Sequence, residues 1–174
     1  MRDRFWLGWL TGMVSAGVVA FVVPYTGLVN MAATGKPNFL DRAGHEALDS
    51  ALRWHAPSAH NPSTAAAATR QGFDVYQTEC VTCHGAPDVA PNDFVKAMLP
   101  PPPRLWSDDT QQMPDGELFW IVKNGVRMTG MPAFGPQHDD RTIWEIVGFL
   151  RQLGHLDPRQ TFDLQTVARC GLGG

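Results

Sequence analysis

The sequence lacks the features of several common classes of protein. Its 174 residues contain no run of Lys and Arg, and the formal net charge is -3, so nothing indicates a nucleic-acid-binding surface. Three cysteines are too few for a disulfide framework. No segment alternates apolar and polar residues with a period of two, so we predict no β-sheet. A hydrophobic content of 44% excludes a disordered chain.

Ionisable side chains are absent from residues 5–23, FWLGWLTGMVSAGVVAFVV. A helix of this length covers roughly the 30 Å of a bilayer's hydrocarbon core. Arg2 and Arg4 precede the stretch and no basic residue follows before Lys36, which favours a cytoplasmic N-terminus. A cleaved signal peptide is the alternative, but its apolar part is usually shorter and is followed by small residues. We therefore predict a single transmembrane helix that anchors the chain, within residues 1–25.

The remaining residues divide into three parts by composition. Residues 26–63 are polar and rich in small residues, and predict a linker with one short helix near 41–54 and a Pro-bearing hinge at 56–64. This linker helix is either a solvated spacer or a docking helix for a membrane partner. Residues 64–156 predict an all-α domain with helices at 65–79, 115–124 and 140–153. Residues 157–174 are left as a C-terminal tail.

The predicted helices are few and the loops between them are long and Pro-rich, notably LPPPPRL at residues 99–105. About 110 residues arranged in this way form a thin hydrophobic core. We therefore expect a bound group to fill the centre of the domain.

The motif CVTCH spans Cys80 to His84 and directly follows the first predicted helix of this domain. C-x-x-C-H is the attachment signature of c-type haem. Two thiols about one helical turn apart can each form a thioether with one porphyrin, and the adjacent histidine then supplies an axial nitrogen to the iron. A thioredoxin-like dithiol would need a βαβ pattern, and a zinc site would need further ligands. A buried cysteine pair beside a fortuitous histidine would leave the thin core unexplained.

The second axial ligand decides the chemistry of such a haem. We predict Met131, which lies in TGMPAFG, where Pro132 prevents a helix and two glycines allow the backbone to approach a flat ring. Met128 is the next candidate, followed by Met113 and Met98. His138 is a more distant alternative, because an exposed loop position is the more natural reading of that residue.

Four segments together carry a family resemblance: CVTCHG, LPPPPRL, GELFWIVKNGVRMTGMPAFG and IWEIVGFLRQLG. The chain resembles the class I cytochromes c, and more closely the bacterial membrane-anchored monohaem cytochromes c. The resemblance implies three to four helices around one covalently bound haem, with His84 and Met131 on the iron. It also implies that the haem domain lies in the periplasm, tethered to the inner membrane.

The resemblance implies further contacts within the domain. Gly72 and Tyr76 should pack against an aromatic residue of the last helix, which we take to be Phe149 with Ile146. Arg104 or Trp106 should lie near the haem propionates. A proline carbonyl should orient the proximal imidazole, and both Pro87 and Pro91 are open as its source.

A haem iron with histidine and methionine ligands has no open position for a substrate, so one-electron transfer remains. We predict a carrier, or the haem subunit of a membrane oxidoreductase, between a dehydrogenase or quinol-oxidising partner and a downstream acceptor, without substrate conversion of its own. Residues 64–174 carry nine Lys or Arg and thirteen Asp or Glu, a formal charge of -4, so a strongly basic docking face is not expected. The alternative is a haem enzyme or gas sensor with a labile or open sixth position.

Overall fold

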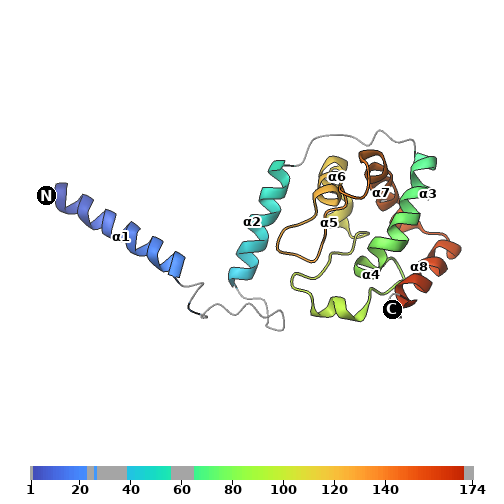
Figure 1. Ribbon diagram of the computed structural model, residues 1–174, viewed down its shortest axis with the longest axis horizontal. Helices are drawn as coiled ribbons and strands as arrows, with labels where there is room; N and C mark the ends of the chain where they lie inside the picture. Colours follow the sequence, from blue (N-terminus) through green and yellow to red (C-terminus); the bar gives the residue numbers. More distant parts are fainter. Residues whose placement is uncertain (1, 23–25, 27–38, 56–64, 171–174) are drawn as a thin grey trace. The chain divides into compact units, whose positions relative to one another are not determined.

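Helices make up nearly all of the regular structure in the computed structural model, which describes residues 2–22, 26, 39–55 and 65–170 (Figure 1). Over these described ranges no strand occurs, and only Ala86 and Val89 form an isolated bridge. The helical character predicted from the sequence is therefore confirmed. The chain divides into two units, residues 1–36 and residues 37–174.

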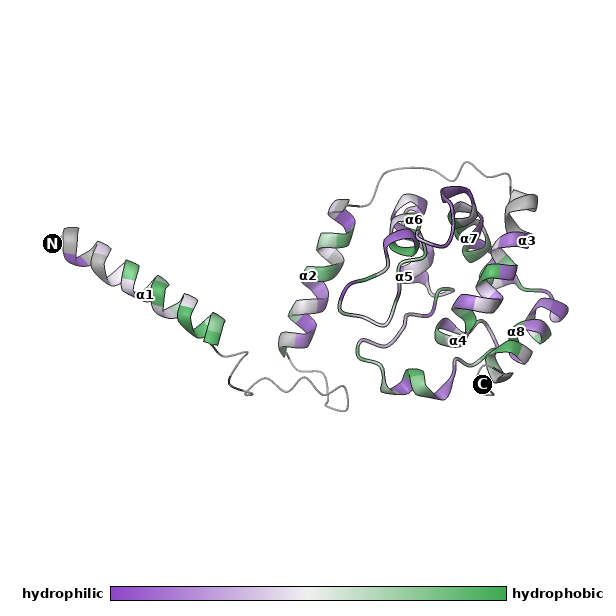
Figure 2. Cartoon of the chain, in the orientation of Figure 1, coloured by the Kyte–Doolittle hydropathy of each residue, from purple (hydrophilic) through white to green (hydrophobic). Residues whose placement is uncertain are grey.

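The first unit contains α1, Arg2–Val22, at the position of the predicted anchor. The prediction of a transmembrane helix is wrong: within the part of the chain that is described, no helix is both long enough and apolar enough to cross a membrane. Figure 2 shows pale residues among the hydrophobic ones along α1. Its sequence includes the small or weakly polar residues Gly8, Thr11, Gly12, Ser15 and Gly17. The predicted single-pass location in a bacterial inner membrane rested on this segment and is wrong for the same reason.

The second unit begins with α2, Phe39–His55, which confirms the short helix predicted near residues 41–54. The rest of the predicted linker, at 27–38 and 56–64, lies outside the described residues.

The haem-domain helices predicted from periodicity are confirmed as α3 (Ala65–Val75), α6 (Asp115–Asn124) and α7 (Asp140–Gln152). A π-helical turn, Tyr76–Cys80, continues α3 into the short α4, Val81–His84. Shorter elements are the 3-10 turns Asp93–Ala97 and Leu153–His155 and the helix α5, Asp108–Gln111. Asp139 caps α7 by accepting a hydrogen bond from the Thr142 amide at 2.8 Å.

The centre of the fold is the crossing of α3 and α7. A Cβ atom on Gly72 would lie 2.2 Å from the Glu145 carbonyl oxygen, so only glycine permits this approach. One turn further on, the ring of Tyr76 packs against that of Phe149, with centroids 5.2 Å apart. Ile146 is also buried in this cluster. The packing of Gly72 and Tyr76 against the last helix of the domain is thus confirmed.

The residues predicted as a C-terminal tail contain another helix, α8, Pro158–Cys170. Its Leu164 is fully buried, and Gln165 Nε2 donates a hydrogen bond to the Asp88 carbonyl oxygen at 3.1 Å. A capping signal in the sequence marks its start: Asp157 accepts from the Gln160 amide at 2.8 Å, and Gln160 Oε1 accepts from the Asp157 amide at 3.1 Å. The helix packs against α4 and the π-helical turn, which together contain the CVTCH segment.

Candidate functional site

The imidazole of His84 is held in a defined orientation. Its Nδ1 lies 2.9 Å from the carbonyl oxygen of Pro103, and since a carbonyl can only accept, Nδ1 carries the proton. Nε2 is then left with a lone pair for a metal. Burial lowers the pKa of His84, with the hydrogen bond to Pro103 acting in the opposite direction, so the neutral, ligating form is favoured. The orienting carbonyl comes from Pro103, not from Pro87 or Pro91.

A buried tyrosine fixes the chain immediately after His84. The Tyr76 hydroxyl donates a hydrogen bond to the Gly85 carbonyl oxygen at 2.5 Å, and Tyr76 has no exposed surface. Gly85 adopts a φ of 65°, and a Cβ there would lie 2.6 Å from the Val89 carbonyl oxygen. The turn after the motif therefore requires glycine, and the tyrosine ties this turn to the end of α3.

The two thiols of the motif open into one cavity together with His84. Burial, with smaller contributions from Glu79 and Cys83, raises the pKa of Cys80 to about 12, and burial also raises the pKa of Cys83. Redox-active dithiols instead have a thiol of lowered pKa. Across the described residues, no three or more His, Cys, Asp or Glu side chains are grouped so as to hold a metal ion. The raised pKa values of the two thiols therefore disfavour a thioredoxin-like dithiol.

The cavity has a volume of about 400 Å³ and a mainly apolar wall, which suits a flat hydrophobic cofactor. It occupies the centre of the domain, where the sequence predicts a thin core. Its apolar lining includes Leu105, Leu118, Ile121, Val122, Phe134 and Ile146. With both thiols and the oriented imidazole on the same wall, the residues present fit a covalently bound haem.

Met131 lies on this cavity in a loop closed by its own hydrogen bonds. The Met131 amide donates to Thr129 Oγ1 at 3.1 Å, and that hydroxyl donates to the Val126 carbonyl oxygen at 2.7 Å. The Val126 amide donates in turn to the Met131 carbonyl oxygen at 3.2 Å. This ring of bonds holds the methionine at the cavity wall.

The structure separates the other candidates for the sixth ligand. Met128 is 85% exposed and does not line the cavity, whereas Met98 and Met113 do. His138 Nε2 lies within hydrogen-bonding distance of a carboxylate oxygen of Glu79, at 3.0 Å, so that nitrogen is already engaged. The cavity is therefore lined by three of the candidate methionines, Met98, Met113 and Met131.

Arg104 and Trp106 are the residues predicted near the haem propionates. Arg104 is exposed and Trp106 is half-buried against the core, and neither lines the cavity. The basic side chains that do line it, apart from His84, are His45 and Arg53 of α2. Sequence reasoning missed both because α2 was assigned to the linker.

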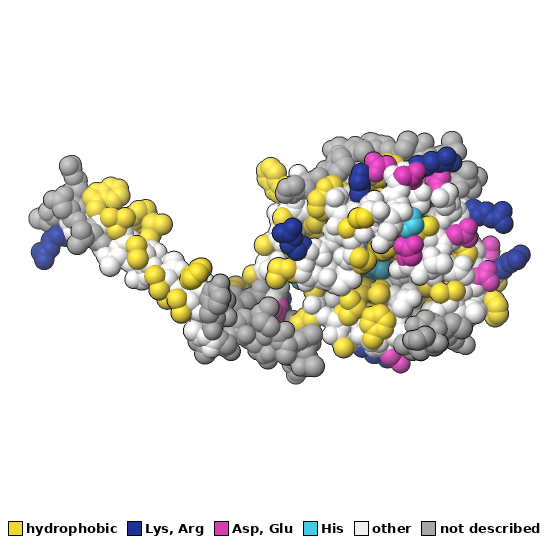
Figure 3. Space-filling view, in the orientation of Figure 1, with side chains coloured by type: hydrophobic (Ala, Val, Ile, Leu, Met, Phe, Trp, Pro, Cys, Tyr) yellow, Lys and Arg dark blue, Asp and Glu magenta, His cyan; other side chains and the backbone are white. Residues whose placement is uncertain are grey.

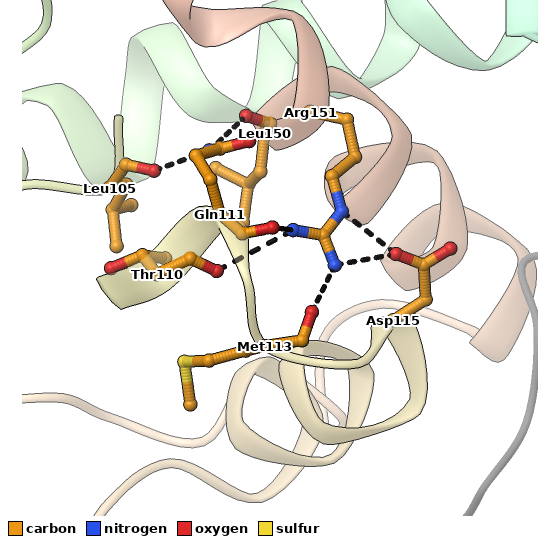
Figure 4. A network of polar contacts seen from close by, with 7 residues as sticks. All are labelled: Leu105, Thr110, Gln111, Met113, Asp115, Leu150 and Arg151. Atoms are coloured by element: carbon orange, nitrogen blue, oxygen red, sulfur yellow. Dashed lines mark hydrogen bonds and ion pairs between the residues drawn. The ribbon is translucent and has the colours of Figure 1, made fainter. Parts of the chain in front are cut away.

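Arg151 bonds to several segments that contribute to the cavity wall (Figure 4). Arg151 of α7 pairs with Asp115 through Nε at 2.8 Å and Nη2 at 2.7 Å. It also donates to the carbonyl oxygens of Gln111, at 2.7 Å, and of Met113. The side chain of Gln111 reaches the carbonyl oxygens of Leu105 at 2.6 Å and Leu150 at 3.0 Å. The network joins α5 and the start of α6 to α7.

The domain that contains this site was compared with known proteins. Residues 67–150 match the family model described as cytochrome c oxidase, cbb3-type, subunit III. The match supports a c-type cytochrome, with haem c as its cofactor and electron transfer as its role. No curated protein and no solved structure matches the chain.

Proposed function

We propose that the chain binds one haem c through Cys80 and Cys83, with His84 and Met131 as the axial ligands, and transfers single electrons between partner proteins. The observation that carries this proposal is the convergence of these four side chains on one apolar cavity. When bound, haem supplies an iron that exchanges one electron, and a methionine sulfur favours its reduced form.

The protein's own residues keep the site closed and rigid. Pro103 orients His84, and the ring of hydrogen bonds around Thr129 holds Met131. The apolar wall excludes water, which further favours the less charged, reduced state of the iron. With both axial positions filled from the chain, no position is open to a substrate, so we infer an electron-transfer protein and not a catalyst.

The family match suggests the class of partner. It supports a role as a haem subunit or a carrier that serves a terminal oxidase. We propose that its electrons arrive from a dehydrogenase or quinol-oxidising protein. In Figure 3 charged groups of both signs are scattered over the face in view, and no field of one sign dominates it.

The assignment of Met131 is tested by replacing each candidate methionine in the holoprotein. Met131→Ala should abolish the methionine–iron charge-transfer band, let the ferrous protein bind carbon monoxide, and lower the reduction potential. Met128→Ala is the matched control, since its side chain is exposed and should leave all three unchanged. Loss of the band in Met98→Ala or Met113→Ala alone would place the ligand there. Ready carbon monoxide binding by the unsubstituted protein would instead favour a gas sensor or haem enzyme.

A further inference from the structure

The helix α2 covers part of the candidate haem cavity, although it precedes the residues matched by the cytochrome family model. Four of its side chains, His45, Leu48, Leu52 and Arg53, line the cavity. Positions 45, 48 and 52 follow the spacing of one helical face. Leu48 and Leu52 are half-buried, while Trp54 on the same helix is 86% exposed. One face of α2 is therefore turned to the cavity.

The charges on the cavity wall make this helix important for an anionic cofactor. Glu79, Asp109 and Glu117 contribute carboxylates to the lining. Haem adds two propionates, and burying further negative charge beside these groups is costly unless a cation compensates it. Arg53 is the arginine that lines the cavity, while Arg104 lies away from it.

Arg53 has a geometry suited to this task. Its Nε lies 3.9 Å from Glu117 Oε1, which is an ion pair but too long for a direct hydrogen bond. The side chain of Glu117 is 9% exposed, whereas that of Arg53 is 72% exposed. The guanidinium therefore lies at the rim of the cavity, between a buried carboxylate and solvent, and its planar fork matches the two oxygens of a carboxylate.

We propose that α2 is a lid of the haem site, in which Arg53 binds a haem propionate and Leu48 and Leu52 cover the adjacent edge of the ring. This inference rests on the proposed haem function and adds a binding residue to it. A positive charge at the propionates favours the reduced iron, so α2 also raises the reduction potential.

The test compares Arg53→Gln with Arg42→Gln in the full-length holoprotein. Arg42 is exposed, lies on the same helix about three turns away, and does not line the cavity, so the two variants lose the same charge from α2. We expect a lowered reduction potential and faster hydrogen exchange of α2 amides in Arg53→Gln, with both unchanged in Arg42→Gln. Equal behaviour of the two variants would overturn the proposal.

The same substitution made in a Glu117→Gln protein separates a propionate contact from simple pairing with Glu117. In Glu117→Gln protein, the Arg53→Gln substitution should still lower the potential, because the propionate remains. If the shift disappears in that background, Arg53 acts only through Glu117 and the propionate contact is excluded.

The covalent haem and the methionine–iron band are recorded in the same samples. Their loss in the unsubstituted protein would refute the proposed function, and with it the lid. Their presence without a difference between Arg53→Gln and Arg42→Gln would refute the lid alone.

Discussion

The hydroxyl of Tyr76 is bonded to the carbonyl oxygen of Gly85 across the whole CVTCH segment, at a distance of 2.5 Å. The tyrosine belongs to the π-helical turn before the motif, and the glycine is the first residue after His84. This hydrogen bond therefore links the residues on either side of the segment that would bind the proposed haem. Because the pair is buried, water cannot replace it.

The first prediction concerns Tyr76 at alkaline pH. Burial, with a smaller effect of Cys80, raises the pKa of Tyr76 well above its usual value of 10.0. The folded state therefore retains a proton that the unfolded chain loses above about pH 10, so this contribution to stability is complete below that pH and falls as the pH rises. Tyr76→Phe should remove this pH dependence. Denaturant unfolding at neutral pH and above pH 10 measures this dependence. An equal fall of the unfolding free energy with pH in both proteins would contradict the account.

The second prediction concerns the crossing of α3 and α7. Gly72→Ala places a Cβ 2.2 Å from the Glu145 carbonyl oxygen and 2.8 Å from Phe149 Cβ, and backbone must move to admit it. We expect the free energy of unfolding to fall by about 1–3 kcal/mol. Gly154→Ala is the control, since a Cβ there has nothing within 4 Å. Denaturant melts of the two holoproteins compare them, and equal stabilities would show that α3 and α7 separate without cost.

The third prediction concerns Arg151. Arg151→Lys keeps the charge near Asp115 but cannot reach the carbonyl groups of Gln111 and Met113 with one ammonium group. We expect a loss of about 1–3 kcal/mol in unfolding free energy, because part-buried acceptors are left unpaired. Lys96→Ala breaks the pair with Asp93, whose side chains are 80% and 85% exposed, and should cost less than Arg151→Lys because solvent screens the pair. A larger loss in Lys96→Ala than in Arg151→Lys would contradict this ranking.

Local sequence signals predicted the parts of the fold that depend on local chemistry. The periodicity at 140–153 predicted α7, and the spacing of Cys80, Cys83 and His84 predicted side chains that line one cavity. The family resemblance added the contact of Tyr76 with Phe149, which periodicity alone does not specify.

Contacts between distant segments could not be predicted in this way. The acceptor of His84 is Pro103, whose carbonyl reaches the imidazole only because the loop folds back over it. Phe119 of α6 stacks on Trp144 of α7, with centroids 4.3 Å apart, and no local pattern specifies this contact. The absence of ionisable side chains over residues 5–23 predicted a membrane span, but no helix in the described part of the chain is long and apolar enough for one. The start of α8 does carry a local signal, the capping pattern of Asp157 and Gln160, although composition alone predicted a tail there.

The most direct test of the central claim is the intact mass of the purified, denatured protein, recorded with its pyridine haemochrome spectrum. We predict an added mass of one haem on the unsubstituted chain, and none on the Cys80→Ser, Cys83→Ser double variant. Several haems, or a colourless chain at its unmodified mass, would contradict the account.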